Sequence, residues 1–461
     1  MITQFIILAA GAGTRMRSNT PKVLQPLAGK PLLGHLLSTI EQLPIDKSCH
    51  LITGHQSERV ESFANEQSLS YVINAIYQAE QLGTGHAVQQ ALPHLPDEGM
   101  SVILYADVPL VSGETLTKLI EDAKDSLCLL TQTLDNPKGY GRIIREAGQA
   151  VGIVEEKDAT DDQRQIKEVN TGMMAVNNAV LKSLLPKLQN NNQQQEYYLT
   201  DLIALAHREA LPINTLDVAN PIEAQGVNDK RQLATLERAY QCQLADALLT
   251  QGVTLIDPDR FDLRGTLKIS KDVTIDANCI IEGEVELGEG VSIASHCVIG
   301  TPHQKTVIGN GVEVKSHSVI ECGIIEDNCV IGPYARIRPN THLHENVKIG
   351  NFVEVKKSDI HQGAKVNHLT YIGDATIGSH ANIGAGTITC NYDGVNKSKT
   401  VIGEGAFIGS NSSLVAPVEV KSGAVVGAGS TITRTVEEDQ LAIARGKQRN
   451  IDHWPKPSKK S

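Results

Sequence analysis

The chain has 461 residues, of which 41% are hydrophobic and 21% are charged, and its formal net charge is −11. This length and composition predict about two to four domains with sizeable apolar cores. The acidic balance argues against a nucleic-acid-binding protein, and with no run of about 18 apolar residues the sequence predicts no membrane span. Eight cysteines without a C-x-x-C pair indicate reduced thiols and a cytoplasmic location.

The first half alternates strand-like and helix-like segments. Residues 5–10 form an apolar run, and no basic residue precedes them, so we interpret the run as a strand rather than a secretory signal. Residues 32–43 carry leucine and isoleucine at helical spacing. Further strands are expected at 50–53, 71–74, 102–105 and 127–134, and further helices at 85–92 and 116–123. The alternation predicts an α/β domain over residues 1–229 with a Rossmann-like, mostly parallel sheet, which binds ligands beyond its carboxyl edge.

A long amphipathic helix is expected next. Leu233, Leu236, Tyr240, Leu244 and Leu248 follow one another at spacings of three and four residues. The pattern predicts a helix over residues 230–251, which we interpret as a linker that stops before a glycine.

From residue 252 onward, an aliphatic residue stands at every sixth position over long stretches. One unbroken run consists of Ile325, Ile331, Ile337, Leu343, Ile349 and Val355. A six-residue period is typical of a parallel β-helix, in which three edges make one coil of about 18 residues. The period breaks between Ile383 and Ile402, around Asn391–Gly394, and this insert is either a functional loop or a tolerated surface insertion. The second domain is therefore expected over residues 252–461, with a basic tail.

A glycine-containing loop follows the first strand. Residues 8–16 read LAAGAGTRM, and the two glycines allow backbone N–H groups to approach phosphates, while Arg15 and Lys22 add positive charge. The loop is neither a Walker loop nor a dinucleotide fingerprint. On these residues alone, a tight structural turn is supported as well as a phosphate loop, and Asp107 is as well explained as a turn residue.

The segment LAAGAGTRM, with Pro21 and Lys22 downstream, resembles the signature of the sugar-nucleotide pyrophosphorylases. The resemblance continues at residues 78–84, 105–107, 139–141, 155, 170–172 and 226–228. Together with the hexapeptide half, nearly the whole chain resembles the family of bifunctional bacterial enzymes that join an N-acetylglucosamine-1-phosphate uridyltransferase to a glucosamine-1-phosphate N-acetyltransferase. The resemblance implies a role in forming precursors of peptidoglycan and lipopolysaccharide.

For the first domain, the resemblance implies that a sugar 1-phosphate attacks UTP and that diphosphate leaves. The implied nucleotide and sugar ligands are Leu8, Ala9, Ala10, Gly11, Arg15, Lys22, Gln78, Gly83, Thr84, Tyr105, Ala106, Asp107, Gly141, Glu155, Asn170 and Asn228. Among them, Asp107 and Asn228 are expected to hold one Mg²⁺, a cation that favours oxygen ligands. Arg15 and Lys22 are expected to stabilise charge on the phosphates.

The last third carries a group of cationic side chains that suits a phosphate and coenzyme A, namely Arg336, Arg338, Lys356, Lys357, His368 and Lys397. Acetylating an amine needs a base, and histidine is suited to the task, but fifteen histidines occur and position alone selects none. The resemblance implies a left-handed β-helix, packed as a homotrimer, in which His368 is the base. The implied sugar-phosphate ligands are Arg338, Lys356, Tyr371, Asn382 and Lys397, and the implied acetyl-coenzyme A contacts are Ala385, Asn391, Tyr392, Ser410, Ala428 and Arg445.

Two alternatives stay open at this stage. The chain could be a single-function pyrophosphorylase with a purely structural β-helix, against which His368 and the insert around Asn391 argue. It could also be a non-catalytic regulatory subunit built on the same two folds, against which Arg15, Lys22 and Asp107 argue.

Overall fold

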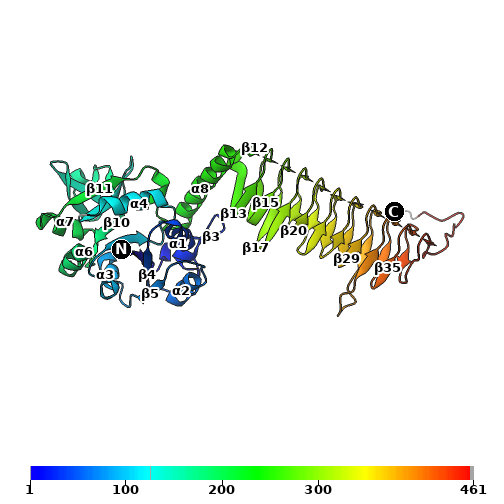
Figure 1. Cartoon of the computed structure of the whole chain (residues 1–461), viewed down its shortest axis with the longest axis horizontal. Helices are drawn as coiled ribbons and strands as arrows, with labels where there is room; N and C mark the ends of the chain where they lie inside the picture. The colour runs from blue at the N-terminus through cyan, green and yellow to red at the C-terminus, as the bar shows by residue number, and fades with distance from the viewer. Residues whose placement is uncertain (1, 125, 457–461) are drawn as a thin grey trace, which may run out of the picture. The chain divides into compact units, whose positions relative to one another are not determined.

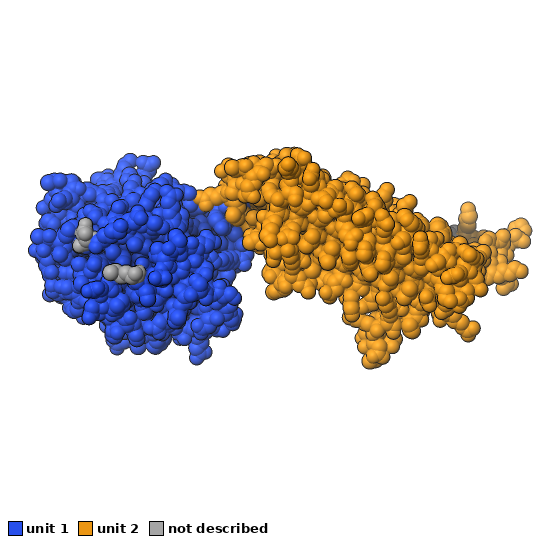
Figure 2. Space-filling view, viewed as in Figure 1, with its two compact units in different colours: residues 1–240 blue, residues 241–461 orange. Residues whose placement is uncertain are grey.

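The computed structural model describes residues 2–124 and 126–456. The chain divides into two compact units, unit 1 over Met1–Tyr240 and unit 2 over Gln241–Ser461 (Figure 2). The division falls within helix α8 (Lys230–Thr250), at the place where the linker helix is expected. In the part of the chain that is described, no helix combines the length and the apolar character needed to cross a membrane.

Unit 1 is built on a nine-stranded sheet (Figure 1). The path of seven strands is β11 (Ile213–Asp217), β7 (Leu127–Thr133), β10 (Glu168–Asn177), β6 (Met100–Tyr105), β1 (Thr3–Leu8), β4 (Lys47–Thr53) and β5 (Ile73–Tyr77). Neighbours on this path are parallel except at β10, which is antiparallel to β6 and β7. A hairpin of β8 (Arg142–Glu146) and β9 (Gln149–Val154) joins β10. The expected mostly parallel α/β sheet is confirmed.

Two apolar cores lie on the two faces of this sheet. Along β1, Phe5 and Ile7 belong to one core and Ile6 to the other, and all three are fully buried. Successive strand side chains point to opposite faces, so burial on both faces explains why this strand reads as a continuous apolar run. The helices of unit 1 are α1 (Leu32–Gln42), α2 (Ser57–Asn65), α3 (Thr84–Gln89), α4 (Gly113–Asp122), α5 (Asp161–Arg164), α6 (Asn178–Leu184) and α7 (Asp201–Arg208).

Most of the expected segments are present with shifted ends. The first strand stops at Leu8, so Ala9 and Ala10 belong to the loop that follows it. The strand expected at 71–74 instead covers Ile73–Tyr77, where its residues pair with β4.

Unit 2 is a parallel β-helix of hexapeptide repeats, as expected. One side is an eleven-stranded sheet of β12 (Thr254–Leu255), β14 (Thr274–Ile275), β16 (Ser292–Ile293), β18 (Glu313–Val314), β21 (Val330–Ile331), β24 (Lys348–Asn351), β27 (Lys365–His368), β30 (Asn382–Ile383), β33 (Phe407–Ile408), β36 (Val425–Val426) and β38 (Leu441–Ala442). All of these strands pair in parallel from coil to coil.

The other two sides belong to one sixteen-stranded sheet. Its long strands β13 (Phe261–Ile269), β15 (Cys279–Leu287) and β17 (Val298–Ile308) pair with one another, and two columns of short strands continue from β17. One column consists of β19 (Val319–Ile320), β22 (Arg336–Ile337), β25 (Glu354–Lys356), β28 (Tyr371–Gly373), β31 (Ile388–Cys390), β34 (Ser413–Val415) and β37 (Thr431–Ile432). The other consists of β20 (Gly323–Ile325), β23 (Thr341–Leu343), β26 (Asp359–Ile360), β29 (Ala375–Ile377), β32 (Thr400–Ile402) and β35 (Val418–Val420).

The inward aliphatic residues stack from coil to coil. Ile331 pairs with Ile349, and Ile349 pairs with Val366, so a coil takes 18 or 17 residues. All three side chains are buried in one continuous core. The shorter coils arise from the five-residue steps in the repeat, and they keep the same register.

The insert is shorter than the sequence predicts. β31 and β32 remain paired in the sheet on either side of it, so only Asn391–Lys399 leaves the coil. This segment closes as a hairpin, because Tyr392 bridges Lys397 and the Ser398 N–H donates to the Asn391 carbonyl at 2.9 Å.

Helix α8 contributes to the cores of both units. Leu236 is buried in a cluster with Met16 and Leu27 in unit 1, whereas Ala245 and Leu248 join the β-helix core. The eight cysteines all lie among the described residues, and all are unpaired.

Candidate active sites

A pocket of about 260 Å³ lies where β1 and β6 end. It is lined by Leu8, Ala9, Ala10, Gly11, Lys22, Val23, Gln78, Gln81, Gly83, Thr84, Ala87, Tyr105, Asp107 and Glu196. Most of the residues expected to bind the nucleotide are therefore brought together. The position at the carboxyl end of parallel strands is the one expected for a ligand site in such a sheet.

The glycine loop packs against the segment that carries Lys22. Gly13 has φ +60, and a Cβ there would lie 2.7 Å from the Cβ of Lys22. The absence of a side chain thus lets the loop approach Lys22 closely. The carbonyl of Ala10 accepts a hydrogen bond of 2.7 Å from Gln81 Nε2, which ties the loop to the far wall of the pocket.

A cationic side chain faces two oxygen donors at one end of this pocket. Lys22 Nζ forms an ion pair with Asp107 Oδ2, and it lies 3.4 Å from Asn228 Oδ1. The Lys22 and Asp107 side chains are only 14% and 16% exposed. The Val227 N–H donates to the Asp107 carbonyl at 2.9 Å, which fixes Asn228 beside the carboxylate. A carboxylate and an amide oxygen that converge on one ammonium group fit the oxygen ligands that Mg²⁺ prefers.

A second group of predicted ligands lies beside Tyr105. The Asn170 N–H donates to the Gly141 carbonyl at 2.9 Å, and Thr200 Oγ1 donates to Glu155 Oε1 at 3.1 Å. Burial raises the pKa of the Glu155 carboxyl above its usual value, although the hydrogen bond from Thr200 opposes the shift. Burial also raises the pKa of Tyr105, and the nearby charges of Glu155 and Asp107 raise it further. The predicted sugar contacts therefore adjoin the pocket.

Two expected nucleotide ligands lie outside this pocket. Arg15 is exposed in a short 3-10 helix, Thr14–Met16, away from the lining residues. Ala106 is fully buried, and its N–H donates to the Leu8 carbonyl at 3.1 Å. Sequence reasoning missed Gln81 and Glu196 as lining residues. Gln81 could have been found within the 78–84 segment, whereas no sequence signal marks Glu196.

In unit 2, His368 ends β27 and its ring is exposed. His368 Nδ1 lies 2.5 Å from Asn351 Oδ1, and the two residues pair in register between β24 and β27. Because the amide oxygen is an acceptor, Nδ1 carries the proton and Nε2 keeps its lone pair. The arrangement leaves Nε2 as a base that can take a proton from a ligand.

Asp374 gathers donors in the neighbouring coils. Its carboxylate accepts a hydrogen bond of 2.6 Å from Asn391 Nδ2 and lies 4.0 Å from Lys356 Nζ and 3.6 Å from Lys357 Nζ. Tyr371 Oη lies beside the Asn391 amide, because a Cβ on Gly373 would meet both. The expected ligands Lys356, Tyr371 and Asn391 are thus brought together.

Arg338 lies next to this group. It forms an ion pair of 2.8 Å with Glu354, which pairs with Tyr371 in the next coil. Its buried Nε has no hydrogen-bond partner, so part of the guanidinium is left for an anionic ligand. Neither Asn351 nor Asp374 was predicted from the sequence, and the coil spacing of 17 residues would have identified Asn351 as the neighbour of His368.

The predicted coenzyme contacts follow one corner of the β-helix. The Ala385 carbonyl accepts a hydrogen bond from Asn411 N, the Ser410 carbonyl from Gly429 N and the Ala428 carbonyl from Arg445 Nη1, at 2.7, 2.8 and 2.6 Å. The His368 carbonyl accepts from Gly386 N on the same corner, at 3.4 Å. These residues therefore form a row that begins at the candidate base.

Three further expected residues lie apart from this row. Asn382 pairs with Lys365 and Phe407 within β30, and Tyr392 is exposed in the hairpin. Lys397 lines a separate pocket of about 380 Å³ with Lys357 and Asp374. The described chain therefore places Lys397 on the opposite side of Asp374 from Asn391's neighbour Tyr371 only through their shared contact with that carboxylate.

Comparisons with known proteins agree with the two units. Residues 5–166 match a family described as a MobA-like NTP transferase domain. Residues 267–301 and 399–434 match the bacterial transferase hexapeptide (six repeats), and residues 324–408 match a GMPPB C-terminal domain.

Curated relatives match over nearly the full length of both chains. A protein from Cellvibrio japonicus is 55% identical over 458 residues, covering 99% of each chain. One from Acinetobacter baylyi is 53% identical over 460 residues, covering 100% of this chain and 99% of the relative. One from Marinobacter nauticus is 52% identical over 456 residues, covering 98% of each. All three are named Bifunctional protein GlmU.

Proposed function

The chain belongs to the bifunctional GlmU family, and we propose that it catalyses two successive steps of UDP-N-acetylglucosamine synthesis. Unit 2 acetylates glucosamine 1-phosphate with acetyl-coenzyme A. Unit 1 then transfers UMP from UTP to the resulting N-acetylglucosamine 1-phosphate and releases diphosphate. We place the domains at residues 1–229 and 252–461, with a helical linker over 230–251.

In uridylyl transfer, the phosphate oxygen of the sugar attacks the α-phosphorus of UTP, and the bond to diphosphate breaks. The glycine loop and Lys22 would position and neutralise the triphosphate, because such a reaction depends mainly on alignment and charge stabilisation. The group around Glu155 and Asn170 would hold the sugar. Gln78 and Thr84 line the same pocket, and we assign them to the uracil.

We assign Mg²⁺ to Asp107 and Asn228, whose oxygens both face Lys22 Nζ. When bound, Mg²⁺ supplies positive charge at the phosphate oxygens. Lys22 would then move its ammonium group from Asp107 to the phosphates, where it offsets the charge of the leaving diphosphate. Asp107 therefore acts in both states, as the partner of Lys22 and as a ligand.

In acetyl transfer, the sugar amine attacks the thioester carbonyl carbon, and the carbon–sulfur bond breaks. His368 Nε2 takes the proton that the amine loses, and Asn351 keeps the ring in the tautomer that makes this possible. Arg338, Lys356 and Tyr371 would bind the sugar phosphate. The coenzyme thiol is released directly, so no cysteine nucleophile is required.

We propose that the coenzyme binds between neighbouring β-helices of a homotrimer. The row formed by Ala385, Ser410 and Ala428 lies along a corner of the coil, where flat sides of a second β-helix can meet it. Both co-substrates, UTP and acetyl-coenzyme A, are metabolites of the cytoplasm, which supports a cytoplasmic location.

The observation that carries this proposal is the convergence of Lys22, Asp107 and Asn228 in the nucleotide pocket of a chain that also pairs His368 with Asn351. To test it, purified protein is incubated with glucosamine 1-phosphate, acetyl-coenzyme A, UTP and Mg²⁺, and the products are identified by mass. UDP-N-acetylglucosamine, free coenzyme A and diphosphate are expected. Uridylyl transfer without acetylation would instead indicate a single-function pyrophosphorylase, and nucleotide binding without diphosphate release would indicate a regulatory subunit.

A further inference from the structure

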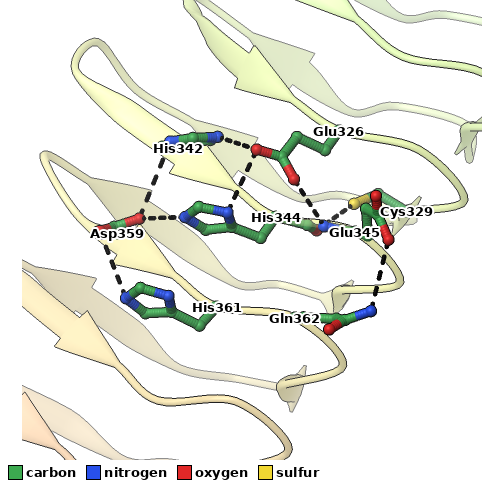
Figure 3. A network of polar contacts seen from close by, with 8 residues as sticks. All are labelled: Glu326, Cys329, His342, His344, Glu345, Asp359, His361 and Gln362. Carbon is green, nitrogen blue, oxygen red and sulfur yellow. Dashed lines mark hydrogen bonds and ion pairs between the residues drawn. The ribbon is translucent and has the colours of Figure 1, made fainter.

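Two adjacent coils of the β-helix place histidines and acids together on the outer surface. Ile325, Leu343 and Ile360 are buried and pair with one another from coil to coil. Because successive strand side chains point to opposite faces, the residues beside these three point outward. We call them the outer cluster: Glu326, His342, His344, Asp359 and His361 (Figure 3).

Three atoms of this cluster converge at one point. Glu326 Oε1 lies 2.6 Å from His342 Nε2 and 3.2 Å from His344 Nδ1. The two imidazole rings stack, with their centroids 4.0 Å apart. In a tetrahedral site with zinc–ligand distances of about 2.0–2.1 Å, ligand atoms lie about 3.3 Å apart. The present separations therefore need only small side-chain movements to admit an ion.

Neighbouring groups already orient two of these ligands. The Glu345 N–H donates to Glu326 Oε2 at 3.2 Å, so the other carboxylate oxygen is turned to the histidines. His344 Nε2 lies 2.8 Å from Asp359 Oδ1. When Nε2–H donates to that carboxylate, Nδ1 keeps its lone pair on the side of Glu326. A carboxylate that holds the outer nitrogen of a metal-ligating histidine is a recurrent feature of zinc sites.

We propose that Glu326, His342 and His344 bind one divalent transition-metal ion of the zinc class, with Asp359 as the group that orients His344. These side chains are partly exposed, so a water molecule can complete the coordination. Two imidazole nitrogens and one carboxylate oxygen suit Zn²⁺, Cu²⁺ or Ni²⁺ rather than Mg²⁺ or Ca²⁺, which favour oxygen ligands alone. The site is separate from the Mg²⁺ ligands proposed in unit 1.

The other half of the cluster is less well arranged for an ion. His344, Asp359 and His361 also lie near one another, but Asp359 meets the two histidines through different oxygens, at 2.8 and 3.4 Å. Both triads need His344, and its two nitrogens can serve two ions only if the ring loses both protons. We therefore expect one ion per chain, bound on the side of Glu326.

The test compares two histidines of the same cluster. Metal-free full-length protein is titrated with Zn²⁺ in excess Mg²⁺, and binding is followed by calorimetry. One tight site per chain is expected; His342→Ala should weaken it at least about tenfold, whereas His361→Ala should stay within about threefold of the parent, because only His342 is a ligand. Both variants should keep both enzymatic activities.

A spectroscopic measurement provides a second readout. Cu²⁺ bound to the parent protein should show nitrogen hyperfine coupling from two imidazoles, reduced to one in His342→Ala. Glu326→Gln keeps the side-chain size and replaces His342→Ala if that variant does not fold, as judged by circular dichroism. No Zn²⁺ binding by the parent, equal affinity in His342→Ala, or a loss confined to His361→Ala would each overturn the assignment.

Discussion

Lys22 and Asp107 form an ion pair across 85 residues of sequence, with both side chains largely buried at the edge of the nucleotide pocket. Each is held by its own segment, Lys22 behind the glycine loop and Asp107 at the end of β6. Because the same carboxylate also faces the amide oxygen of Asn228, the pair marks the point at which charge is balanced before a nucleotide binds.

Asp107→Ala should separate the two activities. Removing this carboxylate should lower uridylyl transfer at least about 100-fold, the scale on which a preorganised charged group contributes. Acetyl transfer in unit 2 should stay at the parent rate. Diphosphate release and coenzyme A release, measured on the same preparation, provide the comparison. Normal uridylyl transfer in this variant would remove Asp107 from the mechanism.

His368→Ala should have the opposite effect. Loss of a general base costs about 10²–10⁴-fold, so acetyl transfer should fall within that range while uridylyl transfer is retained. Asn351→Ala removes the acceptor that holds the ring, and it should lower kcat for acetylation with little change in KM. An acetylation rate for His368→Ala within a few-fold of the parent would contradict the assignment.

Tyr392→Ala tests the hairpin at Asn391–Lys399. The Tyr392 ring is exposed, so its removal should leave the melting temperature unchanged. If the hairpin contacts acetyl-coenzyme A, the KM for this co-substrate should rise while the KM for UTP does not. Steady-state kinetics with each co-substrate varied in turn measure both values, and an unchanged KM for acetyl-coenzyme A would exclude Tyr392 from the site.

Glu155 and Glu156 should affect the pH dependence of stability in opposite directions. Burial raises the pKa of Glu155 above 4.5, so its folded state binds the proton more tightly than the unfolded state does. Its contribution to the free energy of unfolding therefore falls as pH rises above 4.5. Glu155→Gln removes this loss and should gain stability relative to the parent between pH 4 and pH 7.

Glu156 provides the matched control. The Gly139 N–H and the Arg142 guanidinium lower the pKa of its carboxyl, so the stability it contributes is present above 4.5 and is lost as pH falls through the lowered value. Glu156→Gln should therefore be less stable than the parent at pH 7, and the difference should shrink in acid. Denaturant titrations at several pH values measure both trends, and parallel pH profiles for the two variants would contradict these predictions.

Gly283→Ala and Gly290→Ala compare two positions with nearly identical backbones, at φ +69 and +68. Each substitution incurs the cost of a left-handed conformation, about 1–2 kcal/mol. At Gly283 a Cβ would also overlap the carbonyl oxygen of Thr301, whereas at Gly290 it would meet open space. Gly283→Ala should therefore melt at a clearly lower temperature than Gly290→Ala, and equal melting temperatures would show that the coils separate without cost.

The sequence by itself determined the two architectures. Period-six aliphatics such as Ile331 and Ile349 must point into a repeating coil, and the apolar run through Phe5 and Ile7 must be buried on both faces of a sheet. These patterns are local, because the side-chain direction depends only on the position along a strand. The resemblance then directed attention to Lys22, Asp107 and His368 as candidate functional residues.

Only the tertiary structure decided which residues meet. The partner of His368 is Asn351 because one coil here takes 17 residues rather than 18, and a change of register by one residue would turn a different side chain toward the ring. The same coil spacing brings Glu326 to His342 and His344, and the folding of distant segments places Glu196 in the nucleotide pocket. Contacts of this kind depend on register and packing between segments, which no local pattern in the chain specifies.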